Sequence, residues 1–163
     1  MHDIAKFIAG FRRFQRKYFC DDHQLFDELR QGQRPNVLVV SCCDSRVDPT
    51  LLWRCEPGEL FVVRNVAGLV PPYQPDPGLH GVSAAVEYAV TCLEVDHIIV
   101  LGHSFCGGIK ALLRGDEGER AGEFVGKWVG IAAKARDETL SSLADKNENL
   151  RQRACELAAI LVS

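Results

Sequence analysis

The sequence contains no long apolar run, and this absence limits the kind of protein that it encodes. No segment approaches the roughly 20 consecutive apolar residues that a membrane-spanning helix requires. The N-terminal stretch MHDIAKFIAGFRRFQRKYF also lacks an apolar signal core followed by a small-residue cleavage site. Neither charge sign dominates, because 19 basic and 22 acidic residues give a net charge of -3. We therefore expect a cytoplasmic protein with no membrane partner, whose bulk charge does not draw it to nucleic acid.

Internal repeats, low-complexity tracts and linkers are absent as well. The 163 residues fit one domain, and 47% hydrophobic residues suffice for an ordinary core. We predict a single domain over 1–163. It has an N-terminal helical arm over 1–31, a core with the sheet and a metal site over 35–115, and C-terminal helices over 116–163.

The seven cysteines are odd in number and scattered along the chain, which is not the pattern of a disulfide scaffold. In a reducing compartment this pattern predicts free thiols or metal ligands. Cys92 and Cys155 lie in helical patterns, and we expect both to be small buried side chains.

Apolar residues recur at helical spacing near the N-terminus, while basic residues fill the other face. The pattern indicates an amphipathic helix, for which two interpretations are open: a helix on a membrane surface, or a helix packed on its own or a partner subunit. We favour the second. A further helix is predicted over 22–30, before Gly32. The apolar positions of the first helix are Ile4, Phe7, Ile8, Phe11 and Phe14.

Three short runs, NVLVVSC, LFVVRNVA and HIIVLGHS, are rich in Val and Ile and lack polar alternation. Such runs are typical of strands buried on both faces, as in a parallel sheet. A crossover helix is predicted over 81–94, another from Cys106 to Gly115, and two more over 123–143 and 147–163. This order indicates an α/β fold with a mostly parallel central sheet flanked by helices.

Reactive side chains follow the first and the third predicted strands. The sequence CCDSR comes after the first strand, and HSFC comes after the third. Because the carboxyl ends of parallel strands share one edge of a sheet, we expect Cys42, His103 and Cys106 to approach one another. Two thiolates and one imidazole suit zinc, and three protein ligands leave a fourth position open, as in catalytic sites. The alternative is that these are ordinary core thiols and a hydrogen-bonded core histidine.

Spacing alone does not decide whether Cys42 or Cys43 binds the metal, because neighbouring side chains on a strand point to opposite faces. Asp44 and Arg46 are two residues apart and can point the same way. A carboxylate beside a guanidinium stays ionised. Beside zinc, Asp44 can accept a hydrogen bond from metal-bound water or take the open position itself, unless the pair is only an ordinary salt bridge.

The residues of these clusters resemble the β-class carbonic anhydrases. CCDSRV fits the family motif C-x-D-x-R, and GHSFCGG fits H-x-x-C, with PGELFVVRNVAGLVPPY between them. The resemblance implies one Zn²⁺ per chain, bound by Cys42, His103 and Cys106, with Cys43 at the variable position. It also implies a catalytic dyad of Asp44 and Arg46, with Asp44 as a fourth ligand in a closed state.

The resemblance further implies a substrate pocket at a dimer interface, with the N-terminal helices wrapped around the partner. The expected function is zinc-dependent, reversible hydration of carbon dioxide to bicarbonate and a proton by attack of zinc-bound hydroxide. This is a carbonate dehydratase, a lyase, acting as a homodimer or a dimer-based oligomer. Two alternatives remain: a hydrolase of carbonyl sulfide or carbon disulfide on the same fold, and a non-catalytic zinc-binding assembly domain. The implied substrate-binding residues are Gln33, Phe61, Val66, Tyr88 and Gly107.

Three departures from the family pattern carry expectations of their own. Val39 stands where some members have a tryptophan of a regulatory bicarbonate site, which argues against that regulation and favours Asp44 held away from the metal. Phe105 is bulkier than the residue expected inside H-x-x-C, and it should narrow the pocket. Family members usually continue past the point where this sequence ends, so the chain is expected to be short at its C-terminus.

Overall fold

The structure is a computed structural model that describes residues 4–21, 23–114, 122–143 and 147–161, with side chains as far as Cys155 in the last range. The chain forms two compact units, Met1–Arg34 and Pro35–Ser163. Among the described residues, no helix is both long enough and apolar enough to cross a lipid bilayer.

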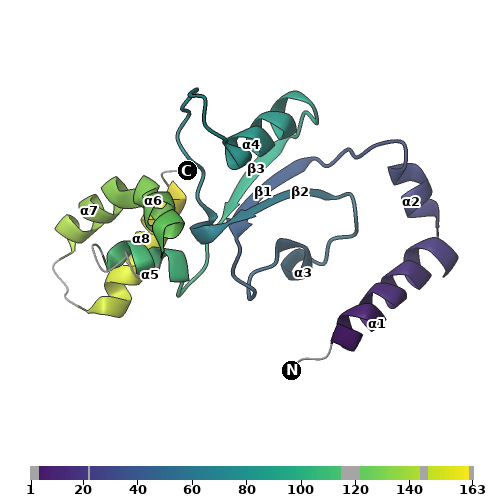
Figure 1. Cartoon of the computed structure of the whole chain (residues 1–163), viewed down its shortest axis with the longest axis horizontal. Coiled ribbons are helices and arrows are strands. Elements are labelled where there is room, and N and C mark those ends of the chain that lie inside the picture. Colours follow the sequence, from purple (N-terminus) through teal and green to yellow (C-terminus); the bar gives the residue numbers. More distant parts are fainter. Residues whose placement is uncertain (1–3, 22, 115–121, 144–146, 162–163) are drawn as a thin grey trace. The chain divides into compact units, whose positions relative to one another are not determined.

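The first unit is helical, as its apolar spacing predicts (Figure 1). Helix α1 covers Ile4–Gln15, a π-helical segment η1 follows over Arg16–Asp21, and α2 covers Gln24–Leu29. The ring of Phe14 lies 5.7 Å from that of Phe26, so aromatic contacts join α1 to α2. The rest of the apolar stripe of α1 is exposed, and Phe7 keeps 65% of its surface accessible.

The second unit contains a three-stranded parallel sheet, which confirms the predicted α/β fold. The strands are β1 (Val37–Cys42), β2 (Leu60–Asn65) and β3 (His97–Leu101), in the order β2-β1-β3. The central strand β1 is almost fully buried. Its register places Cys42 beside Asn65 of β2.

The prediction that all three strands are buried on both faces is wrong for β3. Its first three residues are exposed, and Ile98 keeps 49% of its surface accessible. Among the described residues, β3 is paired with β1 alone and so lies at one end of the sheet, where its start is less covered than β2, which is half-buried throughout at the other end. A Val- and Ile-rich run indicates a strand, but the neighbours of that strand decide whether it is covered.

Helix α4 (Gly81–Thr91) connects β2 to β3 and packs on one face of the sheet (Figure 1). Its Ala89 is buried with Leu38 and Val40 of β1, and Val63 of β2 packs against this group. Cys92 was predicted to be buried, but it is exposed. It lies just past Thr91, the last residue of α4, and so is not part of the helix face that packs on the sheet.

The remaining helices gather near the carboxyl ends of the strands (Figure 1). One apolar cluster joins them to the end of β1, and the buried Cys155 belongs to it as predicted. The single helix predicted over 123–143 is broken, because a 3₁₀ turn begins at Gly130 between α6 and α7. The predicted helix end at Gly115 lies outside the described residues. The elements are η2 (Val66–Gly68), α5 (Gly107–Leu113), α6 (Glu123–Val129), η4 (Gly130–Ala132), α7 (Ala133–Ser142) and α8 (Glu148–Leu161).

The short helix α3 (Pro49–Trp53) was not predicted from the sequence. Asp48 caps it by accepting hydrogen bonds from the backbone N–H groups of Thr50 and Leu51, and Pro49 occupies its first turn. Both features are readable start signals for a helix. The helix has only five residues, too few to show the helical repeat of apolar residues on which the prediction of helices relied.

Candidate metal centre

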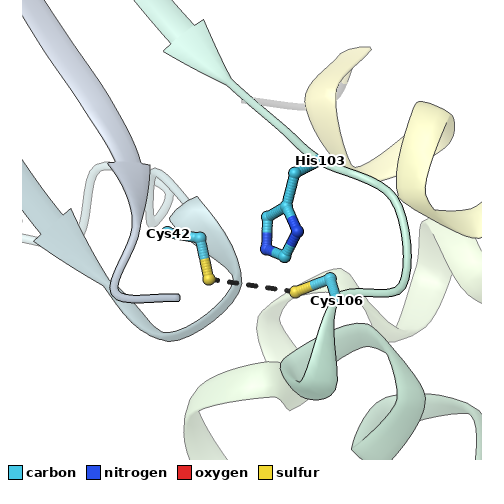
Figure 2. Close-up of side chains that lie close together, drawn as sticks. All are labelled: Cys42, His103 and Cys106. Atoms are coloured by element: carbon cyan, nitrogen blue, oxygen red, sulfur yellow. Dashed lines mark hydrogen bonds between the residues drawn. The ribbon is translucent and has the colours of Figure 1, made fainter. Parts of the chain in front are cut away.

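Three side chains from different parts of the second unit meet at the carboxyl edge of the sheet. Cys42 is the last residue of β1, His103 lies just beyond β3, and Cys106 precedes the first residue of α5. Their ligand atoms all lie within 4.8 Å of one another. Figure 2 shows the three side chains pointing toward a shared space. The sequence prediction that the topology brings these residues together is therefore confirmed.

The geometry fits a zinc ion. The Sγ atoms of Cys42 and Cys106 are 3.9 Å apart. Two sulfurs that each lie about 2.3 Å from a tetrahedral zinc are separated by about 3.8 Å. Cys43, the alternative ligand that spacing left open, is exposed and lies outside this group.

His103 is arranged as a metal ligand through its Nε2 atom. Its Nδ1 lies 3.0 Å from the carbonyl oxygen of Ser104, so this nitrogen carries the proton and donates it there. Nε2 is buried and has no hydrogen-bond partner within the described structure. A buried polar atom without a partner is costly. A metal ion at this position would remove that cost, and the Ser104 contact would fix the ring as ligating histidines usually are fixed.

The Cys106 thiol is protonated at neutral pH in the absence of a metal ion. Burial raises the pKa of the Cys106 thiol to about 11, and the neighbouring Cys42 adds to this rise. Metal ligands must be deprotonated, so binding of a divalent cation here would release protons. The donor set of two soft sulfurs and one imidazole is the type that zinc prefers.

Asp44 and Arg46 form a two-point ion pair next to this group. The Arg46 Nε donates to Asp44 Oδ1 at 2.8 Å, and Nη2 donates to Oδ2 at 2.7 Å. The Arg46 side chain and its backbone N–H together hold the pKa of Asp44 well below its usual range. Asp44 Oδ2 also lies 3.9 Å from His103 Nε2. An acceptor that is ionised at neutral pH is thus placed beside the three ligand atoms.

Arg64 holds the chain between the first ligand and this ion pair. From β2, its Nε donates to the Cys42 carbonyl at 2.9 Å, and its Nη2 donates to the Asp44 carbonyl at 2.8 Å. Its Nη1 contacts Asp48 Oδ2 at 2.7 Å. Sequence reasoning missed this role. The available signal was a lone charged residue inside the apolar strand LFVVRN.

Close backbone packing on the other side of the site depends on two glycines. A Cβ atom on Gly68 would lie 3.0 Å from the backbone nitrogen of Cys42, and Gly68 has a φ of +66°. A Cβ atom on Gly108 would lie 2.8 Å from the Cβ of Ala67. Real Cβ atoms do not come within 2.8 Å of such a neighbour, so position 108 requires glycine. At position 68 the contact would be tight and the positive φ disfavours any other residue, so glycine is strongly favoured there as well.

The predicted substrate-binding residues fall into separate places. Val66 directly follows Asn65, the partner of Cys42 in the sheet register, and the Val66 carbonyl accepts a hydrogen bond from Trp128 Nε1 at 2.7 Å. Gly107 directly follows Cys106 and is exposed. Val66 therefore lies near Cys42 across the sheet, and Gly107 is next to Cys106 in the chain. Trp128 was not identified from the sequence, because its acceptor lies 62 residues away.

Phe61 and Tyr88 lie together at the other end of the sheet. Their ring centroids are 5.9 Å apart. Phe61 pairs with Leu38, four residues before Cys42, which corresponds to about 13 Å along a strand. Gln33 is exposed and belongs to the first unit. The role of these three residues in substrate binding stays a prediction.

Comparison with known proteins agrees with this geometry. A family model described as carbonic anhydrase matches residues 37–163. A carbonic anhydrase of Synechocystis is 45% identical over 111 residues, covering 68% of this chain and 40% of that protein. The chloroplastic β carbonic anhydrase 5 of Arabidopsis thaliana is 37% identical over 150 residues, covering 92% of this chain and 49% of that protein. The chain thus spans half or less of the length of these curated relatives.

Solved structures show the same likeness. The β-carbonic anhydrase CcaA superposes with a TM-score of 0.89 at 35% identity, over 98% of this chain and 76% of that one. A tetrameric β-carbonic anhydrase from Sordaria macrospora superposes with a TM-score of 0.71 at 32% identity, over 94% of this chain and 72% of that one.

Proposed function

Because this chain belongs to the β-class carbonic anhydrase family, we propose that it catalyses the reversible hydration of carbon dioxide to bicarbonate and a proton. The observation that carries the proposal is the carboxylate beside the three ligand atoms. Cys42, His103 and Cys106 can hold a metal, and the ionised Asp44 lies 3.9 Å from the Nε2 of His103. A purely structural zinc site has no need of such a group.

Zinc bound by Cys42, His103 and Cys106 would lower the pKa of a coordinated water towards neutrality and so supply hydroxide. The role of Asp44 is orientation: its Oδ2 accepts the hydrogen of the attacking oxygen, which directs a lone pair at the carbon of the substrate. Because the pKa of Asp44 is lowered, it remains an acceptor at any working pH. Arg46 holds both carboxylate oxygens, which would oppose coordination of a bound metal by Asp44.

The substrate pocket is proposed to need a second copy of the chain. Val66 and the N–H group of Gly107 come from the same unit as the metal ligands. Phe61 lies about 13 Å along the sheet from Cys42, and the ring of Tyr88 lies beside it, so we assign both, with Gln33, to the pocket that two subunits form together. The likeness to a tetrameric β-carbonic anhydrase supports assembly in general.

The N-terminal arm is proposed to pack on the partner subunit. Its apolar stripe is exposed, and a face carrying Phe7, Ile8 and Phe11 is costly to leave in water. We propose that a second copy of the chain covers this stripe, because the proposed substrate pocket already requires two subunits. A cytoplasmic location and the absence of nucleic-acid and membrane partners stay predictions from the sequence.

The proposed function is tested with Asp44→Asn in zinc-loaded protein. The amide keeps the size of the side chain but is a poorer acceptor, so we expect carbon dioxide hydration to fall by about 100-fold or more while zinc content is unchanged. Stopped-flow hydration and metal analysis measure the two quantities. Asp137→Asn is the matched control, because Asp137 also pairs with an arginine but lies on α7. Full hydration activity in the Asp44 variant contradicts the role assigned to Asp44.

The same protein distinguishes the alternative functions. Turnover of carbonyl sulfide or carbon disulfide without turnover of carbon dioxide indicates the hydrolase. Stoichiometric zinc without turnover of any of the three indicates a non-catalytic assembly domain. The comparisons favour carbon dioxide as the substrate, because both relatives described above are named carbonic anhydrases.

A further inference from the structure

We propose that Gln152, on α8, is a positioning residue for the metal ligand Cys106. Gln152 keeps only 7% of its surface accessible and is, with Ser41, one of two buried polar residues in the described part of the chain. Its Nε2 donates to the backbone carbonyl of Cys106 at 3.3 Å. The inference rests on the proposed metal centre, in which the Sγ of the same Cys106 binds zinc.

Cys106 occupies a demanding position in the backbone. Its carbonyl accepts the first hydrogen bond of α5, from the N–H of Lys110 at 3.0 Å. The preceding residue, Phe105, has a φ of +57°, in the left-handed region that residues other than glycine rarely adopt. The loop from His103 to Cys106 is therefore held in a conformation that it does not prefer.

External hydrogen bonds hold this loop at two consecutive carbonyl groups. Arg46 Nη2 donates to the carbonyl of Phe105 at 3.2 Å, and Gln152 donates to that of Cys106. Strained backbone persists only where the surroundings fix it. Arg46 fixes the loop from the side of Asp44, and Gln152 fixes it from the side of α8.

An uncharged donor suits this position. A carbonyl oxygen has two acceptor sites, of which Lys110 uses one and the Gln152 amide uses the other. The two cysteines that are proposed to bind metal as thiolates lie nearby, so a carboxylate at position 152 would add repulsion. Cys155, three residues further along α8, is buried in the same cluster as Cys106. The face of α8 that carries Gln152 is thus fixed against α5, and the amide cannot easily move away.

Loss of this hydrogen bond should act on the metal. Zinc leaves only when the Cys106 sulfur moves, and that movement requires the strained loop to change. Outer-shell partners of ligating residues typically contribute 10- to 100-fold to metal affinity. Gln152 contacts the backbone of the ligand rather than its sulfur, so we expect an effect at the lower end, about tenfold.

The test is the rate of zinc loss from the full chain to an excess of chelator, in Gln152→Leu. Leucine keeps the bulk without the donor. Alanine is less informative, because Gln152 borders a cavity of about 340 Å³ and truncation would admit water as a substitute donor. We expect zinc release to be about tenfold faster and the cobalt-substituted protein to show an altered thiolate charge-transfer band.

Arg136→Leu is the matched control. Arg136 Nη1 donates to the Leu112 carbonyl at 3.1 Å, so the change also removes a donor to α5, but at the end remote from the metal. We expect its zinc release to stay within about twofold of the original rate. If Gln152→Leu does not fold, Gln152→Met, which is uncharged, has a similar length and lacks the donor, is measured in the same way.

Three outcomes overturn the proposal. They are an unchanged release rate with an unchanged cobalt spectrum, equal acceleration in the Gln152 and Arg136 variants, and failure of the original protein to bind zinc. Neither measurement uses carbon dioxide. Faster zinc release in a protein that hydrates no carbon dioxide would therefore support the role of Gln152 and reject the proposed function.

Discussion

Replacing Arg64 with leucine should strongly destabilise the fold at the edge of the site. The side chain is three-quarters buried and makes three hydrogen bonds, to two backbone carbonyls and to Asp48. Leucine leaves all three acceptors without this donor. Breaking a buried, hydrogen-bonded charge pair costs about 3–5 kcal/mol, and partial exposure of both partners reduces this. We expect a loss of about 3 kcal/mol in the free energy of unfolding at pH 7.

The assay is urea unfolding of the metal-free protein, with Arg64→Lys as the comparison. Lysine keeps the positive charge for Asp48 but cannot reach three acceptors, so it should recover only about 1 kcal/mol of the loss. In zinc-loaded protein, Arg64→Leu should also lower carbon dioxide hydration, because the Asp44 carbonyl loses its anchor and the carboxylate loses its position.

The pH dependence of this loss has a definite sign. Hydrogen bonds from Thr50 and Leu51, together with Arg64, lower the pKa of Asp48 below its value in the unfolded chain. A carboxyl group with a lowered pKa stabilises the fold above about pH 4, and this contribution disappears as the pH falls through the folded-state pKa. The difference between the original protein and Arg64→Leu should therefore narrow below about pH 4. A loss under 1 kcal/mol at pH 7, or a difference that widens in acid, would refute this reasoning.

Two further predictions concern Phe105 and the N-terminal arm. Asparagine tolerates the left-handed region better than phenylalanine, so Phe105→Asn should raise the free energy of unfolding by about 0.5–1 kcal/mol in a urea titration. Equal or lower stability would show that no strain is stored there. Phe7→Asp on the exposed stripe of α1 should reduce the molar mass measured by light scattering, whereas Lys6→Asp on the same helix should not. An unchanged molar mass for Phe7→Asp would contradict the proposal that the arm packs on a partner subunit.

The three strands and the three metal ligands were predictable because local patterns determine them. Runs of Val and Ile indicate strands, and parallel strands present their carboxyl ends at a single edge. Cys42, His103 and Cys106 come directly after such runs, so their convergence followed from topology alone. The choice between Cys42 and Cys43 did not follow, because it depends on which face of the strand meets α5.

The features that sequence reasoning missed depend on distant partners. Burial of β3 depends on the strand order, which no run of residues encodes. Arg64 and Gln152 bond to backbone carbonyls 22 and 46 residues away, respectively. Every residue carries a backbone carbonyl, so no sequence motif indicates which carbonyl accepts a hydrogen bond from a distant side chain. Gly130 was a possible signal for the break between α6 and α7. The break was not predicted, because the helical pattern of apolar residues continues on both sides of this glycine.

The hydrogen bonds around Arg46 couple the dyad to the metal loop. One guanidinium binds the Asp44 carboxylate at two points and the carbonyl of Phe105 at a third. For Asp44 to become a fourth metal ligand, at least one of its oxygens must leave Arg46, which would then hold the strained Phe105 without its own counter-charge. In such a closed state Arg46 would still donate to the Phe105 carbonyl, but with fewer contacts to Asp44 to anchor its side chain. The hydrogen bond from Gln152 comes from a different helix and does not involve Asp44, so we expect it to be the same in both arrangements.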